Sequence, residues 1–233
     1  MSTLLLRLAA PLQSWGVDSK FEQRRGTMRE PTKSGVIGMI AAALGRNRDD
    51  PIDDLSALNF GVRIDQPGQI LRDFHTARYK DDKPPYVTNR YYLSDAIFLA
   101  GLEGDYDFLQ EIESAIISPI YPLYLGRRSC PPVGRISLGI NDKSLENALL
   151  EESWQASEIY KRRTSYTNTI NNLTLVIDSK AIGNLRRRDL PLSFSQKYKK
   201  YAYRYIIDTM ISIPTQHKNE TTHDAFDAIE KEV

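Results

Sequence analysis

The 233-residue sequence has a single cysteine, Cys130, and only three histidines. One cysteine cannot form an internal disulfide, and such usage is typical of proteins kept in the reducing cytoplasm, so we expect a cytoplasmic location. His75, His217 and His223 have no zinc-ligand spacing with the cysteine, and we expect no metal and no other cofactor. No apolar run approaches the roughly 20 residues of a membrane-spanning helix, so we expect no membrane contact.

The motifs of several enzyme classes are also missing. The sequence contains no P-loop, no glycine fingerprint of dinucleotide-binding domains and no Gly-x-Ser-x-Gly nucleophile elbow. Apolar residues make up 41% and charged residues 26%, which is ordinary for a globular protein able to bury a core. The sequence therefore carries no signature of these nucleotide-binding and hydrolase classes.

The formal net charge is +1, but the charges are segregated along the chain. Residues 24–48 are rich in Lys and Arg and contain one acid, Glu30, and residues 155–204 carry eleven Lys and Arg against three acids. Clustered like charges repel, so such segments suit a partner of opposite sign, most commonly nucleic acid. A solvated basic face is the alternative interpretation.

The most distinctive stretch is residues 121–132, Tyr-Pro-Leu-Tyr-Leu-Gly-Arg-Arg-Ser-Cys-Pro-Pro. Its prolines and glycine restrict the backbone, and the adjacent Arg127 and Arg128 have no acidic residue within the stretch. A guanidinium pair on a rigid loop suits phosphate, because its planar fork of donors matches phosphate oxygens. A proline-rich turn with solvated arginines is the alternative. Cys130 is interpreted as a small packed residue.

A second candidate anion site lies at the start of a helix predicted over Gly35–Leu44. Pro31–Ser34 supplies capping side chains before the helix, and Gly45 ends it. The first turn of a helix carries free N–H groups and partial positive charge, and Lys33 and Arg29 lie beside it. An ordinary capped core helix is the alternative.

The hydrophobic pattern predicts an α+β fold. In the first half the main elements follow the order β-α-β-β-α-β, which is the ferredoxin-like arrangement of RNA-recognition-motif sheets. Gln66-Pro67-Gly68 predicts a hairpin, and the polar residues 77–90 predict a protruding loop. Besides the helix above, the expected elements are strands at Thr3–Ala9, Asn59–Asp65, Gln69–Thr76, Tyr91–Leu102 and Pro119–Leu125 and a helix at Asp105–Ile117.

The second half is expected to be rich in β-structure. A short helix at Asp142–Glu151 precedes strands at Leu173–Ile177 and Tyr201–Ile213, which flank a basic loop at Arg186–Arg188. We expect three segments: a palm over residues 1–140, a basic β-rich extension of the same body over 141–213, and a polar, mobile tail over 214–233.

Five motifs in order resemble one known family. They are Leu-Gln-Ser-Trp-Gly (12–16), Pro-Thr-Lys-Ser-Gly (31–35), Leu-Gly-Arg-Asn-Arg-Asp-Asp (44–50), Arg-Asp-Phe-His-Thr (72–76) and Tyr-Leu-Gly-Arg-Arg-Ser-Cys-Pro (124–131). The sequence is similar to the CasD family, a subunit of the antiviral type I-E CRISPR Cascade complex. The motifs span residues 3 to about 140, with a looser similarity at 188–191 and 204–206.

The resemblance implies a non-catalytic, RNA-binding subunit that caps the 5′ handle of crRNA with a ferredoxin-like palm and a protruding thumb at about 77–90. Its other partners would be the backbone subunits and the large PAM-reading subunit, with target DNA met only through the complex. Lys33 stands where family members carry arginine, which loses the two-pronged phosphate grip. The residues expected to bind RNA are Gln13, Trp15, Arg24, Arg25, Arg29, Lys33, Ser34, His75, Arg78, Arg90, Tyr124, Gly126, Arg127, Arg128 and Ser129.

Single-stranded RNA is bound by stacking on aromatic or guanidinium planes, and Trp15, Tyr86, Tyr121 and Tyr124 offer such planes or are ordinary half-buried aromatics. Two other functions stay open. In a metal-independent endoribonuclease, as in the related type I-C branch, His75 would act as acid or base, although a structural histidine fits its place in a strand better. In an assembly adaptor, the basic patches would meet acidic protein surfaces.

Overall fold

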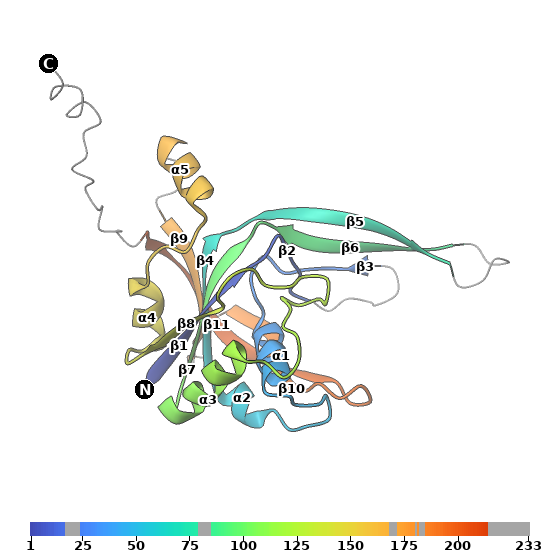
Figure 1. Cartoon of the computed structure of the whole chain (residues 1–233), viewed down its shortest axis with the longest axis horizontal. Coiled ribbons are helices and arrows are strands. Elements are labelled where there is room, and N and C mark those ends of the chain that lie inside the picture. The colour runs from blue at the N-terminus through green and yellow to red at the C-terminus, as the bar shows by residue number, and fades with distance from the viewer. Residues whose placement is uncertain (17–23, 79–84, 168–171, 180, 182–184, 214–233) are drawn as a thin grey trace, which may run out of the picture.

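The computed structural model describes residues 1–16, 24–78, 85–167, 172–179, 181 and 185–213 (Figure 1). A seven-stranded antiparallel sheet with the order β10-β11-β9-β4-β7-β1-β8 forms the centre of the molecule. Its strands are β1 Ser2–Ala9, β4 Asn59–Gln66, β7 Ile97–Gly104, β8 Ser137–Asn141, β9 Asn172–Ser179, β10 Leu185–Ser193 and β11 Lys200–Ser212. A smaller sheet pairs β6 (Tyr86–Ser94) with β2 (Leu12–Gln13), β3 (Arg24–Arg25) and β5 (Gln69–Ala77).

The ferredoxin-like prediction is confirmed. In chain order the palm consists of β1, α1 (Lys33–Ala43), β4, β7, α3 (Tyr106–Ile117) and β8, and in space its strands run β4-β7-β1-β8. This order places each βαβ crossover around an antiparallel strand, as in the split βαβ unit. The short α2 (Asp53–Ala57) lies between α1 and β4.

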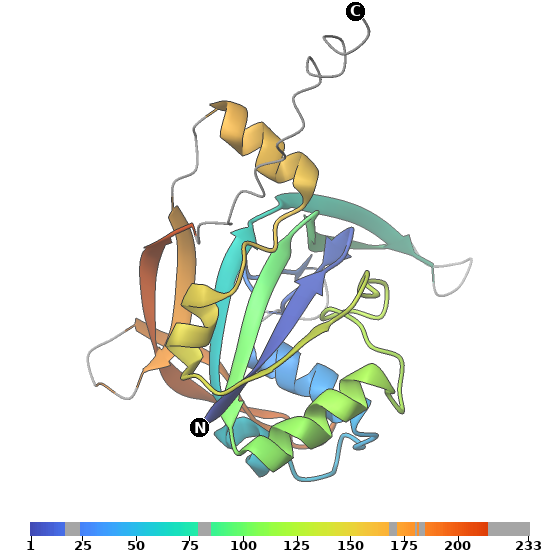
Figure 2. The ribbon, with the colours of Figure 1, turned by 60° about the vertical axis from the view of Figure 1, so that its left-hand side comes forward.

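The sheet is covered on both faces of β1, which explains why β1 reads as one apolar run. Leu4 and Leu6 pack in the larger core cluster with α1 and α3, whereas Leu5 belongs to the cluster under α4 (Leu145–Glu151). Figure 2 shows α4 on its own side of the sheet, and α5 (Glu158–Thr167), which was not predicted, beyond it.

The caps of α1 and α3 are those that the sequence indicates. The Thr32 side chain accepts a hydrogen bond from the Gly35 N–H, and Gly45 with φ +76° follows the last turn of α1. Asp105 caps α3 in the same way. Gly35 leaves room for an indole, since a Cβ there would lie 2.8 Å from the ring of Trp15. Both helices are therefore confirmed.

The hairpin predicted at Gln66-Pro67-Gly68 is wrong. The chain does turn there, with Gly68 at φ +67°, but β4 does not pair with β5. Both edges of β4 are already occupied, one by β7 and the other by β9, so no edge is left for β5. β5 instead leaves the large sheet and pairs along its whole length with β6.

The strand predicted over Tyr91–Leu102 is two strands in different sheets. β6 ends at Ser94 and β7 begins at Ile97, and between them Asp95 adopts φ 55°. β5 and β6 form an arm that projects from the body (Figure 1). This arm runs from Gln69 to Ser94 and is longer than the predicted protrusion, whose tip at 79–84 lies outside the described residues.

Residues 119–125 are not a strand. Pro119 and Pro122 have no N–H to donate to a ladder. Ile120 and Tyr121 donate their N–H groups to the carbonyls of Ala43 and Ala42 at the end of α1. The last strand of the palm is β8 instead.

In the second half, the predicted helix at 142–151 corresponds to α4, and the two predicted strands lie within β9 and β11. The prediction of a basic loop at 186–188 is wrong, because these residues belong to strand β10. The predicted tail at 214–233 lies outside the described residues. Within the part of the chain that the structure describes, no helix has the length and apolarity needed to cross a membrane.

Candidate nucleic-acid interface

Residues 124–130 form a tight loop fixed to the body by backbone hydrogen bonds. The Leu125 carbonyl accepts from the Ser14 N–H at 3.1 Å, and the Leu125 N–H donates to the Cys130 carbonyl at 2.8 Å. The Cys130 N–H in turn donates to the Arg127 carbonyl at 2.8 Å. Gly126 has φ +85°, and a Cβ there would lie 1.7 Å from the Ser14 carbonyl oxygen, so only glycine fits.

The loop brings Arg127 against the small sheet. Its Nη2 donates to the carbonyls of Arg25 at 3.0 Å and Gly26 at 3.5 Å. Its guanidinium carbon lies 4.6 Å from the centroid of the Tyr92 ring on β6. Arg25 on β3 is itself paired with Arg90 on β6. Four arginines thus gather from two strands and the exposed tip of one loop, and we name them the arginine cluster: Arg25, Arg90, Arg127 and Arg128.

Tyr92 lies beneath the arginine cluster and was missed by the sequence reasoning. Burial opposes ionisation of its hydroxyl, but hydrogen bonds from Arg127 and Ser129, the charge of Arg127 and a hydrogen bond from Arg90 lower the pKa of Tyr92 below its ordinary value. The tyrosine therefore holds two guanidinium groups together. Arginine and tyrosine two residues apart on one strand share a face, which is the signal in the sequence that could have found it.

Within the described part of the chain, the arginine cluster keeps its positive charge. Among the described residues, none of its four arginines forms an ion pair with a carboxylate. The Nε of Arg90 and the Nη1 of Arg127 are buried atoms without a hydrogen-bond partner. Positive charge and unused donor capacity therefore remain here for an anion.

The predicted anion site at the start of α1 is contradicted by the structure. Lys33 is buried, and its Nζ donates to the Leu58 carbonyl at 2.6 Å and to Asp178 at 3.1 Å. Its backbone N–H donates to Asp189 at 2.9 Å, so a carboxylate of the chain already occupies the helix terminus. Burial lowers the pKa of Lys33, and the charge of Asp178 opposes that shift. Lys33 therefore does not face RNA.

Two other basic residues are also bound to carboxylates of the chain. Arg204 donates to Asp189 at 2.6 Å and to Asp178 at 2.5 Å, which completes a buried network with Lys33. Arg187 lies 2.5 Å from Glu30. These pairs involve Glu30, Asp178 and Asp189, three of the four acids that the sequence places inside its two basic segments.

Gln13 and Trp15 are likewise structural. Both are fully buried, which contradicts the expectation that they contact RNA. The Gln13 Nε2 donates to the carbonyls of Leu8 and Ala96, and its Oε1 accepts from the Trp15 indole N–H at 3.1 Å. These contacts fix the turn at Ser14, which receives the loop 124–130.

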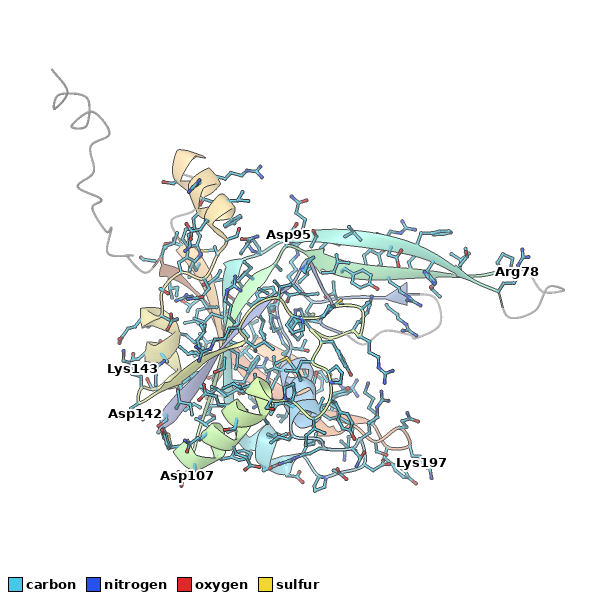
Figure 3. All side chains as sticks on the ribbon, in the orientation of Figure 1. Arg78, Asp95, Asp107, Asp142, Lys143 and Lys197 are labelled. Carbon is cyan, nitrogen blue, oxygen red and sulfur yellow. The ribbon has the colours of Figure 1, made fainter. Side chains whose placement is uncertain are left out.

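The remaining predicted residues lie around the arginine cluster or along the arm. Ser129 is exposed and Tyr124 half-buried in the loop, while the half-buried Ser34 lies 3.4 Å from the Thr32 hydroxyl. His75 and Arg78 are exposed on the arm, and Figure 3 shows Arg78 far from the body. Arg29 is exposed and lines a pocket of about 700 Å³ at the base of the arm. The side chains of Arg24 and Tyr86 lie outside the described part.

Among the described residues there is no group of three or more His, Cys, Asp or Glu side chains that could hold a metal ion. Cys130 is buried, and burial raises the pKa of its thiol.

The fold and the arginine cluster define an α+β protein of ferredoxin-like topology with a basic surface at the root of its arm. The family model described as CRISPR-associated protein (Cas_Cas5) matches residues 3–207. The chain therefore belongs to this Cas5 family of CRISPR-associated proteins, which confirms the resemblance stated above.

Individual relatives agree with the family. "CRISPR system Cascade subunit CasD" of Escherichia coli (strain K12) is 37% identical, with 70% of this chain and 82% of the relative aligned. A solved structure described as "Crystal structure of Cas protein" is 34% identical with a TM-score of 0.72 and covers 92% of this chain and 98% of its own. A chain of a "CRISPR RNA-guided surveillance complex" is 32% identical with a TM-score of 0.75 and covers 91% of both chains.

Proposed function

We propose that this chain is a non-catalytic, RNA-binding subunit of a CRISPR Cascade complex and that it holds the 5′ handle of crRNA. Its similarity to CasD and to a chain of an RNA-guided surveillance complex supports this assignment. In that role the chain also contacts the backbone subunits and the large PAM-reading subunit, and it meets target DNA only through the complex.

The observation that carries the proposal is the arginine cluster without carboxylate partners. Arg127 is positioned by backbone carbonyls and by Tyr92, so its guanidinium is held in place before RNA arrives. A preorganised guanidinium binds phosphate bidentately and loses little conformational entropy on binding. The four arginines of the cluster are assigned to phosphates of the handle, Ser129 to an uncharged hydrogen bond beside them, and His75 and Arg78 to contacts along the arm.

The test is the salt dependence of handle binding. Each phosphate contact to single-stranded RNA contributes about 0.7 to the slope of log K against log salt, so four contacts predict a slope of about −2.8. The double variant Arg127→Ala, Arg128→Ala should lower the affinity and flatten the slope by about 1.4.

The matched control removes two adjacent arginines elsewhere, Arg162→Ala with Arg163→Ala on α5. Equal losses in both double variants would indicate that total charge alone governs binding and would overturn the assignment of the loop. RNA affinity unchanged in the Arg127, Arg128 variant would favour the adaptor function.

Nuclease activity has a direct test. His75 is exposed on β5, opposite Thr88, and the other two histidines lie outside the described residues. Purified protein incubated with repeat RNA in chelator should leave the RNA intact. Cleavage that disappears in His75→Ala would contradict the non-catalytic assignment.

A further inference from the structure

A second surface that combines basic and aromatic side chains lies on β10 and β11, away from the arginine cluster. The guanidinium carbon of Arg186 lies 4.5 Å from the ring centroid of Tyr203 and 5.9 Å from that of Tyr205. Arg186 and Tyr205 are directly paired across the two strands. Tyr203 is 54% exposed, so a large part of this stacked group faces solvent.

The position of Arg204 shows which face of the sheet these side chains occupy. Arg204 lies between Tyr203 and Tyr205 in β11 and binds Asp189, which also accepts the first N–H of α1. Successive side chains of a strand point to opposite faces, so Tyr203 and Tyr205 face away from α1. The loop of the arginine cluster instead packs through Leu125 into the core that α1 covers. The two surfaces are therefore separate.

The charge around Tyr203 has one sign. From residue 185 to 207 the only acid is Asp189, which is buried and bound to Arg204. Exposed lysines Lys197 and Lys199 lie at the turn between the strands, and Figure 3 shows Lys197 projecting from it. The exposed carboxylate of β11, Asp208, has the alternation of Arg204 and therefore lies on the opposite side of the sheet from Tyr203, so a ligand at this face meets cations and rings.

The face is also open at its edge. β10 is the outermost strand of the seven-stranded sheet, and no described strand pairs with its outer side. Pro191 within β10 is tolerated there because an edge strand needs fewer ladder hydrogen bonds. An extended polymer therefore has access along the length of β10 and β11.

We propose that this face, named the Tyr203 platform and made of Arg186, Tyr203, Tyr205, Lys197 and Lys199, binds single-stranded nucleic acid. Lys199 belongs to it because its Nζ lies 5.4 Å from the ring centroid of Tyr201, which alternates to the same side as Tyr203. Flat rings and a guanidinium plane at the surface stack with bases, and the flanking lysines neutralise phosphates. An acidic protein segment would use the charges but not the exposed faces of the rings, which is why the chemistry favours a nucleic acid. The proposal holds whether or not the loop 124–130 binds the crRNA handle.

The test uses the full chain saturated with handle RNA, so that the arginine cluster is occupied. Fluorescently labelled oligo(rU) and oligo(dT) of about 12 nucleotides, within the size that one such surface covers, are then titrated by anisotropy. The double variant Arg186→Ala, Tyr203→Ala should weaken oligonucleotide binding about tenfold or more and leave handle affinity unchanged. Tyr203→Phe keeps the ring and should bind as the unmodified chain does.

The matched control, Arg48→Ala with Tyr106→Ala, removes one exposed arginine and one exposed tyrosine far from both surfaces in sequence. Circular dichroism should first show that each variant is folded. The proposal is overturned if neither oligonucleotide binds, or if the Arg186, Tyr203 variant loses no more affinity than this control. Binding of RNA alone, DNA alone or both supports the platform and identifies the source of the strand. Handle affinity in the Arg127→Ala, Arg128→Ala variant is a separate measurement, so the proposed function and the Tyr203 platform can each be contradicted without the other.

Discussion

Tyr92 explains how exposed arginines are held in place by a buried residue. Arg127, Ser129 and Arg90 lie close enough to its hydroxyl to lower its pKa, and its ring lies against the Arg127 guanidinium, whose carbon is 4.6 Å from the ring centroid. The side chain therefore links β6 to the loop 124–130. Guanidinium groups that would otherwise repel each other gather around one hydroxyl, which keeps both in the same region.

We expect Tyr92→Phe to weaken this link without removing the ring. The arginine donors lose a buried acceptor, which costs about 1–3 kcal/mol in the free energy of unfolding. Handle affinity should fall as well, because Arg127 is no longer held in one orientation. Urea unfolding and RNA titration measure the two effects. An unchanged RNA affinity would show that Tyr92 does not position Arg127.

The lowered pKa of Tyr92 also predicts a pH dependence. A group that ionises more readily in the folded state stabilises that state as it loses its proton. The stability difference between the unmodified chain and Tyr92→Phe should therefore grow as the pH rises from the lowered pKa to the ordinary tyrosine value of about 10, and below the lowered pKa it should stay at a constant, smaller value. Urea unfolding at neutral and alkaline pH tests this, since all other titrating groups are common to both proteins. A difference that shrinks with rising pH would contradict it.

At the scale of elements, the buried network of Lys33, Asp178, Asp189 and Arg204 joins α1 to β9, β10 and β11. Together with the apolar core contacts, this network holds β9, β10 and β11, the three strands on the outer side of β4, against the palm. Removal of one partner leaves buried carboxylates without compensation, so Arg204→Ala should cost about 3–5 kcal/mol of unfolding free energy.

Arg46→Ala is the matched control for the network, because Arg46 pairs with Asp54 at the surface. Its cost should stay near or below about 1 kcal/mol. Similar unfolding midpoints for Arg204→Ala and Arg46→Ala would show that the buried network contributes no more than a surface pair.

The loop 124–130 depends on its glycine. Gly126→Ala has to accept φ +85° and move away from the Ser14 carbonyl, so we expect a loss of about 2–3 kcal/mol in stability together with weaker handle binding. Gly134→Ala separates the effect of the positive φ from the effect of the close contact. Gly134 has φ +76°, but a Cβ added there would meet only a guanidinium nitrogen of Arg7, at 3.9 Å. That control should lose about 1 kcal/mol. Equal losses at both glycines would mean that the contact with Ser14 is unimportant.

The elements themselves were predictable because their signals are local. The apolar run of β1, the caps of α1 and α3 and the basic loop around Arg127 are all readable within about ten residues. Some errors were local, such as the strand placed at 119–125 and the single strand placed at 91–102. The others concern partners far apart in the chain. Lys33 is held by carboxylates 145 and 156 residues away, and no local pattern reveals that. The pairing of β5 with β6 depended on β9 occupying the edge of β4, which is again a distant contact.

At the scale of the whole molecule, the arm is the feature that the core does not explain. Beyond the short pairing of β3 with Asn89 and Arg90 of β6, the described part of the arm consists of β5 and β6 alone, and an isolated two-stranded ribbon is marginally stable in water. Phe74 on this ribbon is 62% exposed and Val87 is 38% exposed. Apolar side chains on a projecting ribbon fit a protein surface that covers them after assembly.

We therefore expect Phe74→Thr to act on assembly and not on folding. Threonine keeps the strand propensity and removes exposed apolar surface, so the melting temperature of the isolated chain should stay within about 2 °C. Copurification of the other Cascade subunits with a tagged chain at moderate salt should fall, because the variant lacks the apolar ring that contacts the partner subunit. Val133→Thr, at a 55% exposed position on the body, is the control and should leave copurification unchanged. Full recovery of the subunits with Phe74→Thr would show that the arm makes its contacts through RNA and backbone groups instead.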